Sequence, residues 1–307
     1  MIVAITGANG FIGQHLVHRF GNAGWEVRSV VRRDIELGHF GEHFAGADVV
    51  VHAAGATRAP SVAELNEANV ELTSRMLQAA RDARVQRFIF VSSLAAAGPA
   101  KSLEEPVSEE TPPAPIESYG QSKLNAEKLV REAGGLAWVI VRPAAVYGPG
   151  DRDFLPVFRL ARRGVALHPA NRDHWLSIIH VADLAEAILR CASSDSAPGR
   201  VYCLGNGEPV QWADVFRLAA RCSKGELAVD IEIPAVIVDA GALVGDAIAR
   251  VTHRAGLLTT EKVALSKARY WTCTSELAAR ELGFVAKTPL QQGLCETYQW
   301  YLERGWL

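Results

Sequence analysis

Residues 1–33, MIVAITGANGFIGQHLVHRFGNAGWEVRSVVRR, carry the pattern that most clearly indicates the fold class. Its apolar run Ile2–Thr6 is typical of a buried parallel strand, and the glycines of Gly7–Gly13 follow at once. Apolar residues then recur at helical spacing over Ile12–Asn22, and Trp25–Val31 has the pattern of a second strand. A strand, a glycine-rich turn, a helix and a strand predict the first unit of a parallel sheet.

The same alternation continues through residue 142, which predicts helices on both faces of the sheet. Ser61, with Glu64 three residues later, forms a capping box at the start of a long helix. The other expected elements are strands at 47–53, 87–92, 136–142 and 200–204, a short strand near 35–37, and helices at 61–84, 117–132 and 183–191.

We therefore predict an α/β fold, with a Rossmann-type doubly wound parallel sheet and a smaller mixed C-terminal domain. Residues 1–164 and 176–204 are assigned to the domain that contains the sheet. Residues 165–175 and 205–307 are assigned to the smaller domain, which we expect to bind the substrate.

The composition is that of an ordinary globular chain. Of the 307 residues, 49% are hydrophobic and 21% are charged, and the net charge is −2. This balance gives no electrostatic reason to expect binding to nucleic acid or to an anionic membrane. The five cysteines form no CxxC pair, so we expect neither a disulfide framework nor a metal site. Scattered thiols, and a start without a basic region or cleavage site, favour the cytoplasm.

The most apolar later stretch covers residues 233–251. Asp239 and Asp246 interrupt it, so it is too short for a transmembrane helix. Together with Arg250, these two carboxylates share one face of the expected helix. Two interpretations stay open: a soluble helix with one polar stripe, or an apolar lid over the substrate that touches a membrane.

Gly7, Gly10 and Gly13 form a GxxGxxG motif between the first strand and the first helix. The first glycine allows a tight turn, the second lets the backbone approach a pyrophosphate, and the third brings the helix close to the strand. The N-terminus of the helix then offers free N–H groups and a partial positive charge. The motif therefore predicts a dinucleotide-binding site.

The end of the second strand bears on the choice of nicotinamide cofactor. An NAD site usually has a carboxylate there, about 20 residues after the glycines, which accepts a hydrogen bond from the ribose 2′-hydroxyl. Here Val31 stands at that place, and Arg32 and Arg33 follow. Because arginine pairs with a 2′-phosphate, we expect NADP to be preferred over NAD. The alternative is that both arginines are solvated and either cofactor binds.

Tyr119 and Lys123 form a YxxxK motif, which puts both side chains on one face of a helix. A tyrosine that acts as an acid or base near neutrality needs its pKa lowered by roughly 3 units from about 10. A nearby ammonium group and an oxidised nicotinamide ring favour the phenolate in this way. Ser93, in the pair Ser92–Ser93 at a strand end, can hold the substrate oxygen.

Several segments resemble, in their order, the extended short-chain dehydrogenases/reductases, also called the NAD-dependent epimerase/dehydratase family. These segments are TGANGFIG, VSSLAAAG, SYGQSKLNAEK, RPAAVYGPGD and IIHVADLAEAI. The resemblance covers essentially the whole chain, including WTCTSELAARELGF and GLCETYQWYLERGWL near its end.

The resemblance implies a catalytic trio in which Tyr119 donates or accepts the proton, Lys123 binds the nicotinamide ribose and Ser93 polarises the substrate carbonyl. Asn69 matches an asparagine common in the family. Two histidines at family positions, His52 and His180, are interpreted as structural. With Arg32, the expected cofactor-binding residues are Gly7, Gly10, Phe11, Ile12, Gly13, Ala53, Ala54, Gly55, Tyr119, Lys123 and Pro143.

Departures from the family pattern narrow the function. Leu94–Ala95 follow Ser93 where sugar-nucleotide dehydratases have an Asp-Glu pair, and Ala144–Ala145 replace a polar asparagine. Leu176 stands near the place where sugar-nucleotide epimerases often have an arginine, although Arg172 is close in sequence. The apolar stretch and the following LLTTEKVALSKARYW resemble the branch of hydroxysteroid dehydrogenases and dihydroflavonol reductases, which enclose apolar alcohols or ketones.

Three functions stay open at this point. The first is an NAD(P)-dependent oxidoreductase that transfers hydride between nicotinamide and an alcohol or ketone carbon, with Tyr119 as acid or base. The second is a nucleoside-diphosphate-sugar 4-epimerase, and the third is a non-catalytic NAD(P)-binding protein. The resemblance also suggests a homodimer packed through the helices at about 66–83 and 118–132.

Overall fold

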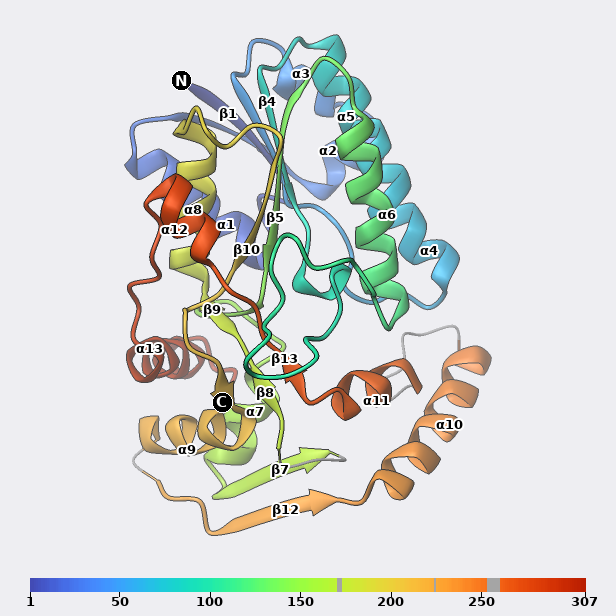
Figure 1. Cartoon of the computed structure of the whole chain (residues 1–307), viewed down its shortest axis with the longest axis vertical. Coiled ribbons are helices and arrows are strands. Elements are labelled where there is room, and N and C mark those ends of the chain that lie inside the picture. Colours follow the sequence, from blue (N-terminus) through green and yellow to red (C-terminus); the bar gives the residue numbers. More distant parts are fainter. Residues whose placement is uncertain (170–172, 224, 253–259) are drawn as a thin grey trace.

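The computed structural model describes residues 1–169, 173–223, 225–252 and 260–307. Its centre is a six-stranded, all-parallel sheet with the strand order β10-β5-β4-β3-β1-β2 (Figure 1). These strands are β1 (Ile2–Thr6), β2 (Glu26–Val30), β3 (Val49–His52), β4 (Arg87–Val91), β5 (Ala137–Pro143) and β10 (Arg200–Leu204). The predicted Rossmann-type doubly wound sheet is confirmed.

Helices cover both faces of this sheet (Figure 1). The first face carries α1 (Phe11–Asn22), α8 (Val181–Ser193) and α12 (Glu276–Leu282). The opposite face carries α3 (Phe40–Phe44), α5 (Leu72–Asp82) and α6 (Ser118–Glu132). Each layer encloses its own apolar core, with Phe20 and Ile188 in the first and Phe44 and Met76 in the second. The strand ends are thereby held between two rigid layers.

The long helix expected over 61–84 contains an irregular turn. It consists of α4 (Val62–Asn66), a π-helical turn (Glu67–Glu71) and α5. The predicted cap is confirmed, because the Ser61 hydroxyl accepts a hydrogen bond from the Glu64 backbone N at 3.2 Å.

The short strand expected near 35–37 is wrong. Arg32–Leu37 form a helix, α2, in which the Asp34 carboxylate accepts a hydrogen bond from the Val31 backbone N at 2.8 Å. This bond satisfies a backbone donor at the helix N-terminus, and Gly38 (φ 76°) ends the helix in the left-handed region. The local capping residues therefore outweigh the apolar pattern of this segment.

Smaller sheets and helices fill the lower part of the molecule in Figure 1. The sheets have the orders β11-β8-β13, β12-β7 and β6-β9. Their strands are β6 (Ala145–Tyr147), β7 (Val165–Pro169), β8 (Trp175–Leu176), β9 (Ile178–His180), β11 (Val210–Gln211), β12 (Val229–Ile233) and β13 (Tyr270–Trp271). The helices are α7 (Leu155–Ala161), α9 (Trp212–Cys222), α10 (Ala235–Thr252), α11 (Thr260–Lys267) and α13 (Leu290–Glu303). Phe158, Phe216 and Tyr301 belong to the core of this part.

The apolar stretch of residues 233–251 forms the end of β12 and most of α10. Val238 is buried, whereas Val236 and Leu243 are exposed at 77% and 65%. The outer face of α10 therefore leaves apolar side chains exposed. No helix among the described residues is long and apolar enough to cross a membrane.

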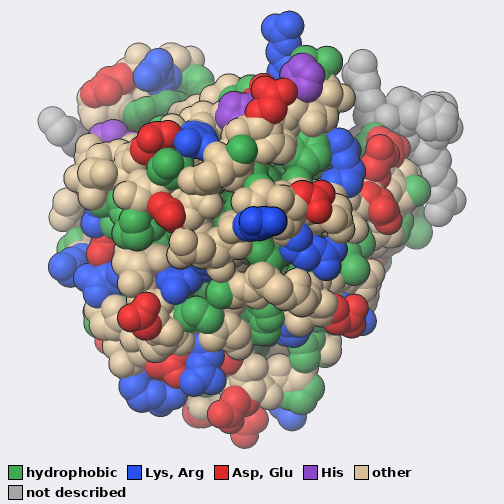
Figure 2. All heavy atoms as spheres, turned by 90° about the horizontal axis from the view of Figure 1, so that it is seen from above, with side chains coloured by type: hydrophobic (Ala, Val, Ile, Leu, Met, Phe, Trp, Pro, Cys, Tyr) green, Lys and Arg blue, Asp and Glu red, His purple; other side chains and the backbone are tan. Residues whose placement is uncertain are grey.

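Of the three side chains expected to form a polar stripe on α10, only that of Asp239 lies within the described residues. The Asp239 carboxylate pairs with the Lys267 ammonium of α11 at 2.7 Å. The side chains of Asp246 and Arg250 lie outside the described residues. The face of the molecule in Figure 2 carries basic and acidic side chains interspersed with one another.

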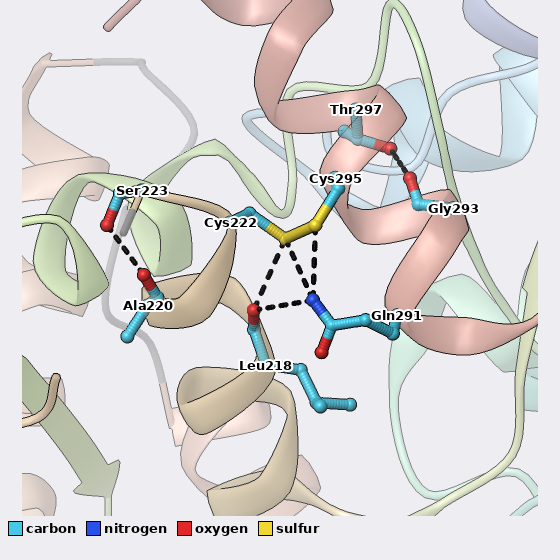
Figure 3. Close-up of a disulfide and its surroundings, with 8 residues drawn as sticks. All are labelled: Leu218, Ala220, Cys222, Ser223, Gln291, Gly293, Cys295 and Thr297. Carbon is cyan, nitrogen blue, oxygen red and sulfur yellow. Dashed lines mark hydrogen bonds between the residues drawn. A yellow bond between two sulfur atoms is a disulfide. The ribbon is translucent and has the colours of Figure 1, made fainter. Parts of the chain in front are cut away.

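The expectation that the cysteines are scattered thiols is wrong for one pair. Cys222 at the end of α9 is bonded to Cys295 of α13, with the Cα atoms 4.9 Å apart (Figure 3). The two positions are 73 residues apart in sequence, and the packing of α9 against α13 brings them into disulfide range. No local spacing could have marked this pair. The free cysteines are Cys191, Cys203 and Cys273, all buried.

Candidate active site

The strand order reverses beside β1, since the chain passes from β1 to β2 on one side and then returns to β3 on the other. In doubly wound sheets, ligands bind in the crevice at the carboxyl ends of the strands at this point. Gly7 ends β1 with φ 72°, and a Cβ added there would lie 2.9 Å from the Ala54 backbone N. The residues predicted at the two strand ends, Gly7 and Ala53–Ala54, are thus brought together.

The other two glycines of the motif shape the start of α1. A Cβ on Gly13 would lie 2.0 Å from the Gly7 carbonyl oxygen, so this close approach of α1 to β1 requires glycine. Gly10 is exposed and forms the N-cap, and Phe11 and Ile12 begin the first turn. A bare glycine backbone and the N–H groups of a helix N-terminus fit the pyrophosphate of a dinucleotide.

The end of β2 lies beside the glycine turn, because the Gly7 backbone N donates to the Val30 carbonyl at 3.0 Å. Arg32 and Arg33 occupy the first turn of α2, and both are exposed. The Asp34 carboxylate is turned back to the α2 N-terminus. This end of the crevice therefore presents two guanidinium groups.

The three candidate catalytic residues meet at the carboxyl end of β4. Ser93 follows that strand and caps the short helical turn Leu94–Ala96. A hydrogen bond joins the side chains of Ser93 and Tyr119. Lys123, one turn further along α6, donates from Nζ to the Val91 carbonyl at 2.9 Å. The structure thus brings all three residues together.

Two neighbours of Tyr119 set its position. The Glu117 carboxylate caps α6 by accepting from the backbone N atoms of Tyr119 and Gly120, at 2.9 and 2.6 Å. A Cβ on Gly120 would lie 2.2 Å from the Ala95 carbonyl oxygen, so α6 approaches the Ser93 turn more closely than any other residue permits. Sequence reasoning missed Gly120, although a glycine inside a helix next to the candidate acid is a signal.

Asn69 lies in the π-helical turn and holds the loop after β3. Its amide exchanges two hydrogen bonds with the Ala56 backbone, each 2.9 Å, and donates to the Ser122 hydroxyl at 2.9 Å. A Cβ on Gly55 would lie 2.7 Å from the Asn69 oxygen and 3.4 Å from Lys123 Nζ. The predicted cofactor residue Gly55 therefore lies beside the candidate lysine, and π turns are frequent at functional sites.

The pKa of Tyr119 differs from the expected lowering. Burial of the phenol raises the pKa to about 12; the Ser93 hydrogen bond lowers it, and the Glu117 and Asp153 carboxylates raise it further. The phenol is therefore protonated at neutral pH in this structure. Burial also lowers the pKa of Lys123 to about 8, against the attraction of Glu127.

The histidines interpreted as structural lie in packed surroundings. The His52 ring contacts the hydroxyls of Thr6 and Thr73 at 2.7 and 3.1 Å. Burial, helped by the charge of Lys123, lowers the pKa of His52 to about 3, so the ring is neutral. His180 is the N-cap of α8, where burial lowers its pKa.

The positions that depart from the sugar-nucleotide pattern are mostly buried and apolar. Leu94 beside Ser93, Ala144 after Pro143, and Leu176 in β8 are all buried, whereas Ala145 is exposed. Pro143 itself is buried at the end of β5, next to β4. Arg172, the nearest arginine in sequence to Leu176, lies outside the described residues.

Two loops at the crevice are linked by an ion pair that the sequence did not indicate. Arg58, in the loop after β3, pairs with Asp153 in the loop after β6 at 2.5 Å, and both side chains are exposed. The second loop also reaches α1, since the His15 ring contacts the Pro149 carbonyl at 2.8 Å. Arg58 and Asp153 are far apart in sequence, and only the fold brings them together.

The chain is similar to known reductases and to a known epimerase. A ceramide reductase of Caulobacter vibrioides is 33% identical, with 100% of this chain and 96% of the relative covered. The 4-hydroxy-2-methyl-3-oxo-4-farnesyl-3,4-dihydroquinoline-1-oxide ketoreductase of Stigmatella aurantiaca is 33% identical over 94% of this chain and 93% of its own length. A UDP-glucose 4-epimerase of Vibrio cholerae is 28% identical over 76% of each chain.

Solved structures show the same architecture. MoeE5 in complex with UDP-glucuronic acid and NAD has a TM-score of 0.78 and 25% identity, covering 99% of this chain and 100% of that one. A sequence model described as "NAD dependent epimerase/dehydratase family" matches residues 3–205. The chain therefore belongs to the NAD-dependent epimerase/dehydratase family of extended short-chain dehydrogenases/reductases.

Proposed function

We propose that the protein transfers hydride between a nicotinamide cofactor and an alcohol or ketone carbon, with Tyr119 as the acid or base. The observation that carries this proposal is the meeting of Ser93, Tyr119 and Lys123 beside the glycine-lined crevice. Family membership already indicates an NAD(P)-dependent dehydrogenase/reductase or epimerase.

Each member of the trio has a distinct role in the proposal. The Ser93 hydroxyl donates a hydrogen bond to the substrate oxygen, and the Tyr119 phenol gives its proton to that oxygen when a ketone is reduced. A pKa of about 12 keeps Tyr119 protonated at neutral pH, which suits proton donation. Lys123 binds the ribose hydroxyls, and the bound cofactor supplies or accepts hydride. The other cofactor contacts are proposed for Gly7, Gly10, Phe11, Ile12, Gly13, Arg32, Ala53, Ala54, Gly55 and Pro143.

We propose an apolar ketone or alcohol as the substrate. Leu94, Ala144 and Leu176 are buried apolar residues at positions where sugar-nucleotide enzymes carry polar groups. A desolvated diphosphate needs paired cations, which apolar side chains do not supply. The two relatives at 33% identity are named for a ceramide and for a farnesyl-substituted dihydroquinoline, both of which are lipophilic.

A nucleoside-diphosphate-sugar 4-epimerase is the second candidate. It is supported by the UDP-glucose 4-epimerase relative and by the similar structure solved with UDP-glucuronic acid. Such an enzyme oxidises and re-reduces the same sugar, so it consumes no NADPH overall. A non-catalytic NAD(P)-binding protein is the third candidate, and the presence of all three trio residues argues against it.

The proposal includes NADP in preference to NAD, because Arg32 and Arg33 follow β2 where an NAD site usually has a carboxylate.

We also propose two domains, residues 1–164 with 176–204 and residues 165–175 with 205–307. A homodimer through 66–83 and 118–132 is proposed as well. We also propose a cytoplasmic location. The Cys222–Cys295 disulfide is the observation that counts against it, because disulfides are rare in reducing compartments.

An assay of the purified protein with two substrate panels tests the proposal. NADPH and NADH are each combined with apolar ketones, and separately with UDP-, GDP- and dTDP-sugars. The proposal predicts oxidation of NADPH in the ketone panel. Conversion of a sugar nucleotide without net oxidation of NADPH, and no turnover of any ketone, would favour the epimerase. Light scattering of the same preparation tests for the dimer.

A further inference from the structure

A buried ion pair lies next to Lys123 on α6, and the function proposed above assigns no role to it. The Glu127 carboxylate, four residues after Lys123 on α6, is fully buried. Its two oxygens accept from Nε and Nη2 of Arg142 on β5, at 2.9 and 2.7 Å, and the Arg142 side chain is also buried. Arg131 adds a third contact at 3.0 Å from its more exposed position.

The same carboxylate holds the end of β4. The Ser92 hydroxyl donates to Glu127 Oε1 at 2.7 Å, and the Ser92 backbone N donates to the Val141 carbonyl at 2.8 Å. Ser92 stands between Val91, whose carbonyl accepts from Lys123, and Ser93, whose side chain is bonded to Tyr119. The buried hydrogen bond from Ser92 to Glu127 therefore fixes the backbone between Val91, which holds Lys123, and Ser93, which holds Tyr119.

Stability alone gives little reason for such a group. Removing two charges from water is costly, and apolar residues of similar volume often serve the core as well. Buried polar groups can instead select one arrangement among several. Glu127 thus links α6 to the end of β4 and to β5, close to Ser93 and Lys123.

Glu127 also acts on Lys123 through its charge. The titratable groups that face Lys123 are Tyr119 and Glu127 on α6 and His52 on β3, and the His52 ring is neutral. Glu127 is therefore the anion that favours the ammonium form against burial. Among the described residues, the groups that face the Glu127–Arg142 pair are Lys123, Arg131, Glu109 and Cys203.

We propose that Glu127 is a positioning residue, which through its bond to Ser92 fixes the end of β4 and hence the arrangement of Ser93, Tyr119 and Lys123. The proposal rests on the function proposed above. It predicts that the buried hydroxyl of Ser92, which is bonded to Glu127, affects turnover.

The test uses Ser92→Ala, which removes the hydroxyl and leaves Glu127 paired with Arg142. We expect kcat to fall about 10-fold, while KM for NADPH changes by less than about 2-fold, because the step that needs alignment is affected and cofactor binding is not. The matched control is Thr297→Val, which removes a buried hydroxyl bonded to the Gly293 carbonyl at 2.7 Å in α13. It should lower the melting temperature and leave kcat unchanged.

A second variant, Glu127→Gln, tests the charge independently of turnover. The amide keeps an acceptor for Ser92 but removes the anion, so nitrogen NMR titration should show a lower pKa for Lys123 than in the wild type. Wild-type kcat in Ser92→Ala would overturn the positioning role, and an unchanged Lys123 pKa would overturn the charge effect. A wild-type protein that turns over neither panel would contradict the proposed function instead, and the titration would still decide whether the charge of Glu127 acts on Lys123.

Discussion

At the scale of single residues, two buried groups that differ in charge stand one helical turn apart. Tyr119 is held in its neutral form, because burial raises the pKa of its phenol to about 12. Lys123 is half-way to losing its proton at about pH 8, because burial lowers the pKa of its ammonium. A neutral phenol and a cation together suit proton donation to a ketone oxygen.

The pKa of Lys123 leads to a prediction on stability. Between pH 8 and 10.5 the unfolded chain binds a proton at this lysine that the folded chain does not bind. The free energy of unfolding should therefore rise with pH across this range in the wild type, relative to Lys123→Met, and the difference should be constant below pH 8. Urea unfolding of both proteins at a series of pH values measures it. A difference that stays constant up to pH 10.5 would contradict the assigned burial.

Arg32 leads to a prediction on cofactor choice. If its guanidinium pairs with a 2′-phosphate, Arg32→Ala should raise the dissociation constant of NADPH by about 10-fold or more, as expected for a charge-assisted hydrogen bond. The dissociation constant of NADH, which lacks this phosphate, should not change. Fluorescence titration with both cofactors measures the two values, and an equal loss for both would show that Arg32 does not read the phosphate.

At the scale of elements, the approach of α6 to the turn after β4 decides whether the trio can meet. Glu117 caps α6 at Tyr119, and Gly120 lets the helix backbone contact Ala95. The turn at Leu94–Ala96 and the first turn of α6 therefore act as one unit. Their contact places the phenol against the Ser93 hydroxyl.

Gly120→Ala tests this contact. The new Cβ would lie 2.2 Å from the Ala95 carbonyl oxygen, so α6 must shift away from Ser93. We expect kcat to fall by at least about 10-fold and the melting temperature to decrease. Gly21→Ala is the control, since a Cβ at that position of α1 meets nothing within 4 Å. It should keep full activity and gain roughly 0.5–1 kcal/mol of stability.

The sequence predicted regular elements well and irregular ones poorly. The strands Ile2–Thr6 and Arg200–Leu204 and the helix beginning at Glu117 agree with the structure within a residue, because each has a clear period and a clear stop. The π turn within 61–84 left no trace in the apolar pattern. Residues 35–37 were misassigned because the capping contacts of Asp34 and Gly38 favour a helix over residues 32–37.

The candidate site was predictable where glycine or short spacing leaves a signature, as at Gly7 and Tyr119. The Glu127–Arg142 pair was not, because charged residues at helical spacing usually indicate an exposed face. Only the register of β4, β5 and α6 turns this carboxylate inward.

At the scale of the whole molecule, a covalent link ties the two helices that flank the lower core. The Cys222–Cys295 bridge joins the end of α9 to α13 (Figure 3). Neither of these two helices carries a predicted site residue. The link should therefore affect stability more than activity.

Cys222→Ser with Cys295→Ser tests that expectation. Because the bridge closes a loop of 73 residues, its loss should lower the free energy of unfolding by about 4 kcal/mol. The melting temperature should fall to the same value that the wild type shows in reductant, while kcat stays unchanged. A wild-type protein whose melting temperature does not respond to reductant would argue that the bridge is not formed in solution.

The role of Tyr119 as proton donor is best tested by the turnover of Tyr119→Phe with NADPH and the best ketone of the panel, together with the NADPH dissociation constant of this variant. We expect kcat to fall by at least about 100-fold, because the proton donor is lost, while NADPH binds as tightly as in the wild type. Wild-type turnover in Tyr119→Phe would show that this phenol is not the proton donor.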